Sequence, residues 1–267
     1  LLSHMKLTII CAGNIGGAIA RGLANGTSIK ASDITCADPS SKTLEHIQAV
    51  NPSIRTSSYN CKAISNADII LIAVKPWLVE KVRNEIKPNL KFEKQRIVAI
   101  AAGITFQQLE TFVEKEATPM PALFRLIPNT AIDVKSSMTF ISAQNATEEQ
   151  TKIMLKIFNE LGLTMLLEER LIGPGTALGS SGIAFAFRYI RAAIEGGIEL
   201  GFYPEQAKEI VLQTFKGAVE LLITKGTHPE EEIDKVTTPG GITIKGLNAM
   251  EHGGFTSAVV KGLLASK

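Results

Sequence analysis

The segment Lys6–Gly16, with the sequence KLTIICAGNIG, decides the fold of this chain. Its first half is an apolar run of the kind that forms a buried strand, and apolar residues at helical spacing continue from Gly16 to Ala24. Gly13 and Gly16 therefore lie in a turn between a strand and a helix, which is the setting of a dinucleotide-binding fingerprint. The start of such a helix offers unpaired backbone N–H groups and a positive dipole end to a pyrophosphate.

Strand-like and helix-like stretches alternate outward from this turn through the first half of the chain. Such alternation predicts parallel strands joined by right-handed helical crossovers. The apolar runs that we interpret as strands are Lys6–Cys11, Ile34–Ala37, Ile69–Val74, Ile97–Ala101 and Met138–Ser142. The stretches with helical periodicity are Gly16–Ala24, Ser41–Val50, Trp77–Ile86 and Thr105–Val113.

The second half of the chain is predicted to be helical, since its pattern after about Leu167 favours helices punctuated by glycine and proline. The expected helices are Thr176–Leu200, Pro204–Thr224, Ile242–His252 and one from about Thr256. We therefore predict an α/β fold, with a Rossmann-type doubly wound sheet over residues 5–167 and an all-helical domain over residues 168–267.

The composition argues against several classes of function. The chain has 267 residues, 45% of them hydrophobic, and a formal net charge of +2, so nothing favours binding to nucleic acid or to a membrane surface. Cys11, Cys36 and Cys61 lack the spacing of metal ligands, so we expect no metal site. Residues Leu1–His4 look like a cloning remnant before Met5, which leaves no room for a signal peptide, and we expect a cytoplasmic protein.

Two features of the phosphate turn leave its details open. Cys11 stands where the fingerprint usually has its first glycine, and a small residue fits there provided that its φ angle is negative. Asp38 ends the second predicted strand, where an acidic residue binds the ribose hydroxyls of NAD, or it simply begins an Asp-Pro turn. Ser40, Ser41 and Lys42 follow, and they are suited to hold the extra phosphate of NADP.

Further strand ends converge on the same crevice, since ligands of open α/β sheets lie beyond the carboxyl ends of the strands. Small residues there leave room for a nicotinamide ring, and Lys75 either reaches a phosphate or ribose or only begins a helix. Asn129 either bonds the nicotinamide edge or organises its own turn. The segments concerned are Ala73-Val74-Lys75-Pro76, Ala101-Ala102-Gly103 and Pro128-Asn129-Thr130.

Seven motifs occur in an order and spacing that point to one family. They are Cys-Ala-Gly-Asn-Ile-Gly at 11–16, Ala-Val-Lys-Pro at 73–76, Ala-Ala-Gly at 101–103, Pro-Asn-Thr at 128–130, Gly-Ser-Ser-Gly-Ile-Ala-Phe at 179–185, His228-Pro229 and Pro-Gly-Gly-Ile-Thr-Ile at 239–244. With them the chain resembles the pyrroline-5-carboxylate reductase family over essentially its whole length from Met5. The last motif is the most specific of the seven.

The resemblance implies an NAD(P)H-dependent oxidoreductase that acts on a C=N bond. Its small-molecule substrate would be the cyclic imine 1-pyrroline-5-carboxylate, which is reduced to L-proline in proline biosynthesis. NADP is the expected cofactor, with NAD as the alternative. The family also implies a homodimer formed by the helical domain, and some members assemble further into decamers.

Site residues carry over from the family position by position. The substrate-binding residues implied are Thr238, Gly240, Gly241, Ile242, Thr243 and Ser181. Thr243 is also the implied catalytic residue, because its hydroxyl would bond the imine nitrogen and help to protonate the product, unless a bound water delivers the proton. The cofactor-binding residues implied are Cys11, Ala12, Gly13, Asn14, Ile15, Gly16, Asp38, Ser40, Asn60, Ala73, Val74, Lys75, Pro76, Ala101, Ala102 and Asn129.

Three departures from the family pattern keep alternatives open. Ile183, Phe185 and Arg191 stand where members usually have proline, tyrosine and glutamate. They are compatible with a divergent paralogue that acts on another cyclic imine, or with a non-catalytic nucleotide-binding relative. A β-hydroxyacid dehydrogenase is disfavoured, since the predicted long helix Thr176–Leu200 contains no lysine to serve as its catalytic residue.

Overall fold

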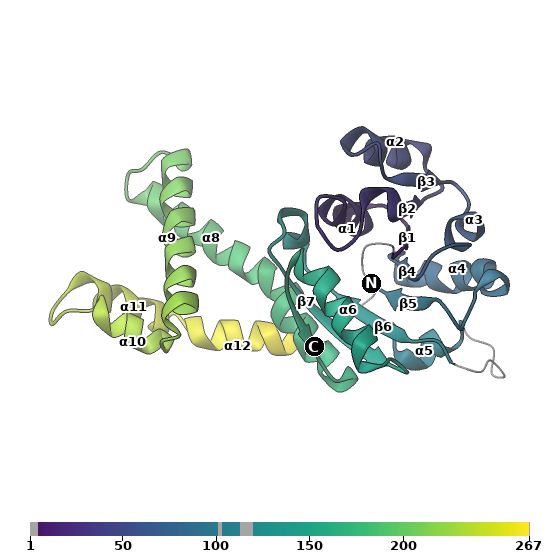
Figure 1. Ribbon diagram of the computed structural model, residues 1–267. Coiled ribbons are helices and arrows are strands. Elements are labelled where there is room, and N and C mark those ends of the chain that lie inside the picture. The colour runs from purple at the N-terminus through teal and green to yellow at the C-terminus, as the bar shows by residue number, and fades with distance from the viewer. Residues whose placement is uncertain (1–4, 101–102, 113–119, 267) are drawn as a thin grey trace. The chain divides into compact units, whose positions relative to one another are not determined.

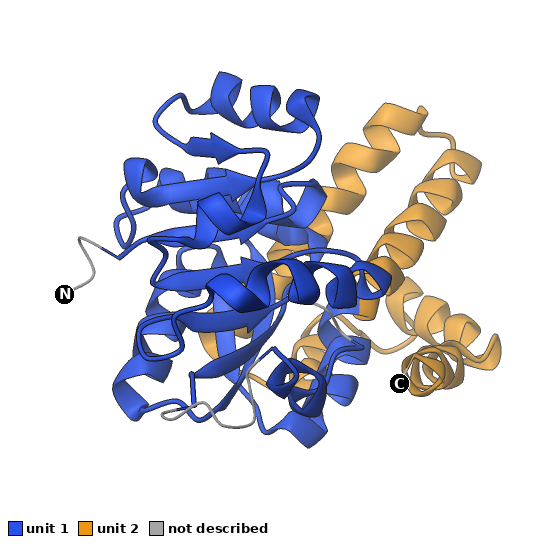
Figure 2. Cartoon of the chain, turned by 90° about the vertical axis from the view of Figure 1, so that its right-hand side faces the viewer, with its two compact units in different colours: residues 1–180 blue, residues 181–267 orange. Residues whose placement is uncertain are grey.

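The chain forms two compact units in the computed structural model, Leu1–Ser180 and Ser181–Lys267 (Figure 2). The structure describes residues 5–100, 103–112 and 120–266. The division lies 13 residues later than the predicted boundary at 167/168, because the segment after Leu167 still packs on the sheet. Ile172 belongs to a small buried cluster with Phe140 and Ile127.

An eight-stranded sheet forms the centre of the N-terminal unit (Figure 1), and its strand order is β3-β2-β1-β4-β5-β6-β7-β8. All neighbouring strands are parallel except β6 and β7, which are antiparallel. The strands are β1 (Leu7–Ile10), β2 (Ile34–Ala37), β3 (Arg55–Ser57), β4 (Ile69–Ile72), β5 (Arg96–Ala99), β6 (Leu123–Ile127), β7 (Ser137–Gln144) and β8 (Gly162–Leu166). The predicted doubly wound sheet is confirmed.

Alternate residues of the central strands belong to two separate hydrophobic cores, one on each face of the sheet. Leu7 and Ile9 belong to a cluster with α1, α2 and α6, whereas Ile10 belongs to a cluster with α3, α4 and α5. This period of two is what a strand covered on both faces requires. The helices are α1 (Asn14–Ala24), α2 (Ser41–Val50), α3 (Asn60–Ile64), α4 (Val79–Ile86), α5 (Phe106–Glu110) and α6 (Glu148–Asn159).

Three strands, β3, β6 and β8, were not among the predicted ones. Arg55 in β3 is exposed and β8 is at most half-buried, so neither has the apolar run that marks a covered strand. β6 is fully buried, but Arg125 interrupts its pattern. The predicted strand ending at Ala101 and the helix ending at Val113 reach outside the described residues.

The prediction of one continuous α-helix over Thr176–Leu200 is wrong for its first six residues. A π-helical segment, Thr176–Ser181, follows the short helix α7 (Ile172–Gly175) and precedes α8 (Gly182–Glu199). A Cβ atom on Gly179 would lie 2.6 Å from Cε2 of Phe140 in β7, so this turn packs closely on the sheet. Such π segments are frequent at functional sites.

The C-terminal unit consists of helices whose apolar side chains remain accessible. They are α8, α9 (Pro204–Lys225), α10 (Pro229–Lys235), α11 (Ile242–His252) and α12 (Phe255–Ala265). Within these described helices Ala207 is the only buried residue. Across the described part of the chain, no helix is both long and apolar enough to cross a membrane.

One carboxylate organises the loop between α1 and β2. Oε1 of Glu160 accepts hydrogen bonds from the backbone N–H and the hydroxyl of both Thr27 and Ser28, at 2.7–2.9 Å. Burial raises the pKa of the Glu160 carboxyl, but these four hydrogen bonds outweigh it and hold the pKa below its ordinary value. The ionised form therefore stabilises the folded state.

We predict that Glu160→Gln lowers the free energy of unfolding by about 1 kcal/mol at neutral pH, because each bond to a charged acceptor becomes a neutral one. A depressed pKa gives stability that is present above the unfolded value and lost as the pH falls through the folded value. The difference from wild type should therefore shrink below about pH 4. Urea unfolding across this pH range measures it, with the exposed Glu45→Gln as the control. A difference that is independent of pH would contradict the assignment.

Candidate functional site

The phosphate turn has a backbone conformation that we did not predict from the sequence. Cys11 has a φ angle of +72°, in the left-handed region, and not the negative value that we expected. Its N–H donates to the carbonyl of Ala37 at 2.8 Å, which fixes the turn to β2. A Cβ atom on Gly16 would lie 2.1 Å from the carbonyl oxygen of Cys11, so only glycine fits at position 16.

The start of helix α1 is suited to bind an anion. Gly13 is its N-cap residue and provides no side-chain hydrogen bond, and the first turn contains no acidic residue. The N–H groups of Asn14, Ile15 and Gly16 are therefore among those that an intrahelical carbonyl does not reach. A Cβ atom on Gly13 would find only Sγ of Cys11, at 3.8 Å, so the space over this glycine is open. These features fit a pyrophosphate.

Asp38 is buried, and both of its carboxylate oxygens bond the backbone. One accepts from the N–H of Ala12 at 3.0 Å, and the other from the N–H of Ser40 at 2.9 Å. Asp38 thus forms the turn, one of the two roles that the sequence left open, and its contact with a ribose stays a prediction. Ser40 caps α2 through its Oγ, whereas Ser41 and Lys42 are exposed at the first turn of that helix.

Five more predicted residues lie near the ends of β3 and β4. The N–H of Ala73 bonds the carbonyl of Ile10, which aligns the end of β4 with the end of β1, and Lys75 is exposed just beyond it. Asn60, at the start of α3, donates from Nδ2 to the carboxylate of Glu85 at 3.0 Å. Val74, which is buried, and Pro76, which is exposed, lie on either side of Lys75 in the same segment after β4. The predicted residues Ala101 and Ala102 lie outside the described part of the chain.

A pocket of about 190 Å³ lies beyond the strand ends. It brings together two predicted residues, Ile15 and Asn129, with residues that the prediction missed. Its lining is Ile15, Ile100, Leu126, Ile127, Pro128, Asn129, Thr130 and Ser180. Ile100 follows β5 directly, so the rule that ligands lie beyond strand ends would have found it.

The side chain of Asn129 links its own turn to the π-helical segment. Its Oδ1 accepts from the N–H of Ala131 at 3.0 Å, and its Nδ2 donates to the carbonyl of Gly179 at 3.0 Å. The bond to Ala131 is the turn-organising contact, and Nδ2 carries a second N–H, so the contact with the nicotinamide stays a prediction. Through Gly179, Asn129 also holds the π-helical segment that ends at the predicted residue Ser181.

The helical unit contains a second glycine turn that leads into an uncapped helix. Gly240 has a φ angle of +71°, and Gly241 is the N-cap of α11 without a side-chain hydrogen bond. The N–H of Gly241 donates to the carbonyl of Thr238 at 2.9 Å, which closes the turn. The N–H of Gly241 is thus used within the turn, whereas those of Ile242, Thr243 and Ile244 are among the groups that an intrahelical carbonyl does not reach, so they are available to an anion.

The three departures from the family pattern lie along α8, which begins after Ser181. Arg191 pairs through Nε with Oε1 of Glu195, at 3.0 Å and one helical turn away, and both side chains are exposed. Its charge is thus offset within its own helix. Phe185 lines a groove in this unit, and Ile183 lies on the same helix.

Two family models match the chain. One is described as pyrroline-5-carboxylate reductase dimerisation and matches residues 169–267. The other is described as NADP oxidoreductase coenzyme F420-dependent and matches residues 6–103. Each therefore matches one of the two sections of the chain that the sequence had separated.

Curated relatives and solved structures agree with the models. Pyrroline-5-carboxylate reductases 1 and 2 of Dictyostelium discoideum are 37% and 36% identical over 97% and 100% of this chain. The chain covers 48% of the first relative and 92% of the second. The crystal structure of Plasmodium falciparum pyrroline carboxylate reductase with NADP bound matches with a TM-score of 0.86 at 29% identity, covering 98% of this chain and 95% of that one.

Two alanine substitutions separate the fold of the phosphate turn from its binding function. Gly13→Ala has room in the turn, so we expect its free energy of unfolding to stay within about 1 kcal/mol of wild type. The added methyl group stands where phosphates must approach, and we expect the dissociation constant of NADPH to rise by about tenfold or more. Gly16→Ala forces the turn apart and should unfold at a lower temperature. Calorimetry with and without NADPH measures both quantities.

Gly13→Ala binding NADPH as wild type does would contradict the placement of the phosphates over this turn. A Gly16→Ala protein that unfolds at the wild-type temperature would contradict the close contact with Cys11.

Proposed function

Since the chain belongs to the pyrroline-5-carboxylate reductase family, we propose that it reduces 1-pyrroline-5-carboxylate to L-proline with NADPH as the hydride donor. The observation that carries the proposal is that the glycine turns of two family motifs, at 11–16 and 239–244, each lead into an uncapped helix, one in each unit. Helix α1 begins after Gly13 and helix α11 begins after Gly241, and neither has a side-chain cap or an acidic residue in its first turn. The reaction needs two such places, because both of its reactants are anions.

The N-terminal unit holds the cofactor in this proposal. The N–H groups at the start of α1 bind the pyrophosphate, and Lys75 at the end of β4 adds a positive charge. Ser40, Ser41 and Lys42 at the start of α2 take the additional phosphate of NADP, which the commitment of Asp38 to backbone N–H groups supports. When bound, the nicotinamide supplies the hydride for the imine carbon.

The helical unit holds the imine. Its carboxylate is bound by N–H groups of Ile242 and Thr243 without a cationic side chain, as anions often are at helix starts. Thr243 is exposed in the first turn of α11, so its hydroxyl is accessible to a substrate bound there. That hydroxyl hydrogen-bonds the ring nitrogen and passes a proton to it, directly or through a bound water. Thr238 supports the turn, and Ser181 adds a hydroxyl at the start of α8.

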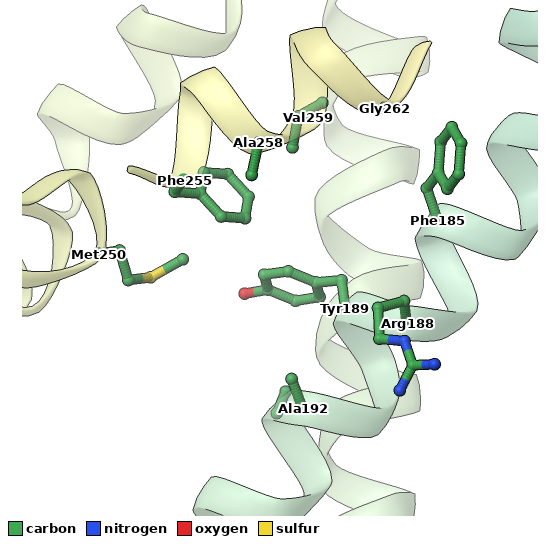
Figure 3. Close-up of a pocket in the computed structure, with 10 residues that line it drawn as sticks. Phe185, Arg188, Tyr189, Ala192, Met250, Phe255, Ala258, Val259 and Gly262 are labelled. Carbon is green, nitrogen blue, oxygen red and sulfur yellow. The ribbon is translucent and has the colours of Figure 1, made fainter. Parts of the chain in front are cut away.

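The helical unit also supports a homodimer. Helices α8, α11 and α12 contain no buried residue of their own, and an apolar groove of about 540 Å³ separates α8 from α12. Tyr189, Phe255 and Met250 point into this groove (Figure 3), with Phe185 and Arg188 beside it. A second copy would cover these apolar surfaces. We propose that such dimers assemble further into decamers, as in some members of the family.

We propose the cytoplasm as the location of the protein. Its three cysteines, Cys11, Cys36 and Cys61, are all free thiols. Free thiols are typical of a reducing compartment. Burial raises the pKa of Cys36 to about 12, so this thiol is an inert core group.

The purified protein, given 1-pyrroline-5-carboxylate and NADPH, should consume the reduced cofactor and form one proline for each cofactor oxidised. Initial rates with NADPH and NADH, and proline measured by amino-acid analysis, test this expectation. We expect a higher kcat/KM with NADPH, because Lys42 and the start of α2 favour an additional phosphate. The absence of turnover with both cofactors would contradict the proposed function.

We predict that Thr243→Ala lowers kcat by about 100-fold, since a positioned proton donor contributes about this much. The dissociation constant of NADPH should stay within about twofold of wild type, because Thr243 lies in the other unit from the phosphate turn. Thr243→Ser keeps the hydroxyl and is the matched control, with most of the turnover retained. Equal losses of turnover and of NADPH affinity in Thr243→Ala would remove the role assigned to this residue.

A further inference from the structure

One carboxylate oxygen of Glu169 joins two elements that are distant in the sequence. Oε1 of Glu169 accepts a hydrogen bond from Nη1 of Arg125 at 2.9 Å and another from the backbone N–H of Phe106 at 2.8 Å. Arg125 is in the middle of β6, and Phe106 is the first residue of α5. Glu169 itself starts the 3₁₀ turn Glu169–Leu171, on the path from β8 toward the helical unit.

The ion pair is held in a fixed place because Arg125 is buried. Only 6% of its side chain is exposed, whereas 41% of the Glu169 side chain is exposed. Burial lowers the pKa of the Arg125 guanidinium, and Glu169 counteracts this by its charge and its hydrogen bond. The guanidinium carbon also lies 6.0 Å from the centre of the Phe106 ring. The guanidinium of Arg125 and the backbone N–H of Phe106 thus both hold the same oxygen of the Glu169 carboxylate.

Both partners of Glu169 belong to segments that border the pocket beyond the strand ends. Arg125 is two residues before Ile127, which lines that pocket together with Pro128 and Asn129. Phe106 begins α5, six residues after Ile100, which lines the same pocket. Glu169 therefore holds the start of α5 and, through Arg125, the strand whose last residues form part of the pocket wall.

We infer that Glu169 is a positioning residue for the nicotinamide end of the cofactor, acting through Arg125 and the N–H of Phe106. This inference rests on the proposed function, because it assigns the pocket to that cofactor. Glu169 touches neither the cofactor nor the imine in this account. It holds the middle of β6 and the start of α5 in place behind the pocket, as groups behind a binding site commonly do.

The test compares Glu169→Ala and Glu169→Gln with Glu168→Gln. The last is a matched control, because Glu168 is the adjacent residue and makes an exposed ion pair with Arg170. NADPH binding is followed by the fluorescence of Trp77, the only tryptophan of the chain, which is 76% exposed just after Lys75-Pro76. Unfolding temperature, kcat and the KM of each substrate are measured on the same preparations.

We expect Glu169→Ala to raise the dissociation constant and the KM of NADPH by about tenfold, with the KM of the pyrroline within about twofold of wild type. Glu169→Gln keeps an oxygen for the N–H of Phe106 but loses the charge, so its NADPH affinity should lie between those of Glu169→Ala and wild type. Glu168→Gln should match wild type in every measurement.

A merely structural role predicts a different pattern. If Glu169→Ala unfolds at a lower temperature but binds NADPH with wild-type affinity well below that temperature, the inference is overturned. Wild-type protein that fails to bind NADPH would instead contradict the proposed function, so the two failures are distinguishable.

Discussion

The close approach of Gly16 to the carbonyl group of Cys11 is the contact on which the nucleotide half of the molecule depends. It lets helix α1 start directly against the end of β1, with its first N–H groups beyond the edge of the sheet. Cys11 adopts a left-handed backbone to make this turn, at a cost of about 1–2 kcal/mol for a residue with a side chain. The hydrogen bonds of Cys11 to β2 and of Ala12 to Asp38 hold the turn in place.

In the proposed function, the two units use the same device for different ligands. In each, a glycine turn leads into an eleven-residue helix without a cap, so that backbone N–H groups are left for an anion. The units differ in how they are stabilised. The sheet has a core on each face, whereas the helices after Ser181 bury almost nothing by themselves. The unit to which we assign the imine is therefore also the one whose apolar side chains a second copy of the chain would cover.

The sequence predicted the elements whose signal is local. Apolar runs located β1, β2, β4 and β5, and the glycine spacing located the phosphate turn, because burial on both faces and close backbone approach leave direct marks on residue type. The motif at 239–244 indicated the second turn in the same way. The short exposed strand β3 and the partly exposed β8 leave no such mark.

The features that the sequence did not settle depend on tertiary contacts. The positive φ angle of Cys11 follows from its hydrogen bond to Ala37, and the π-helical segment follows from the packing of Gly179 on Phe140. The hydrogen-bond partners of Asp38 and Asn129 could not be read from the sequence either, because they lie on other segments as well as in the local turn. Glu169 belongs to no motif, because its two partners, Arg125 in β6 and the N–H of Phe106 at the start of α5, are distant from it in the sequence.

The central claim is that the two turns serve a single hydride transfer, from a cofactor on one unit to an imine on the other. Transfer from NADPH that carries deuterium at the reactive ring carbon tests it most directly, with the product followed by mass spectrometry and NMR. We predict that one deuterium, transferred as deuteride from one face of the ring, appears at the δ carbon of L-proline. Proline without the label at that carbon, or label lost to solvent, would contradict the account.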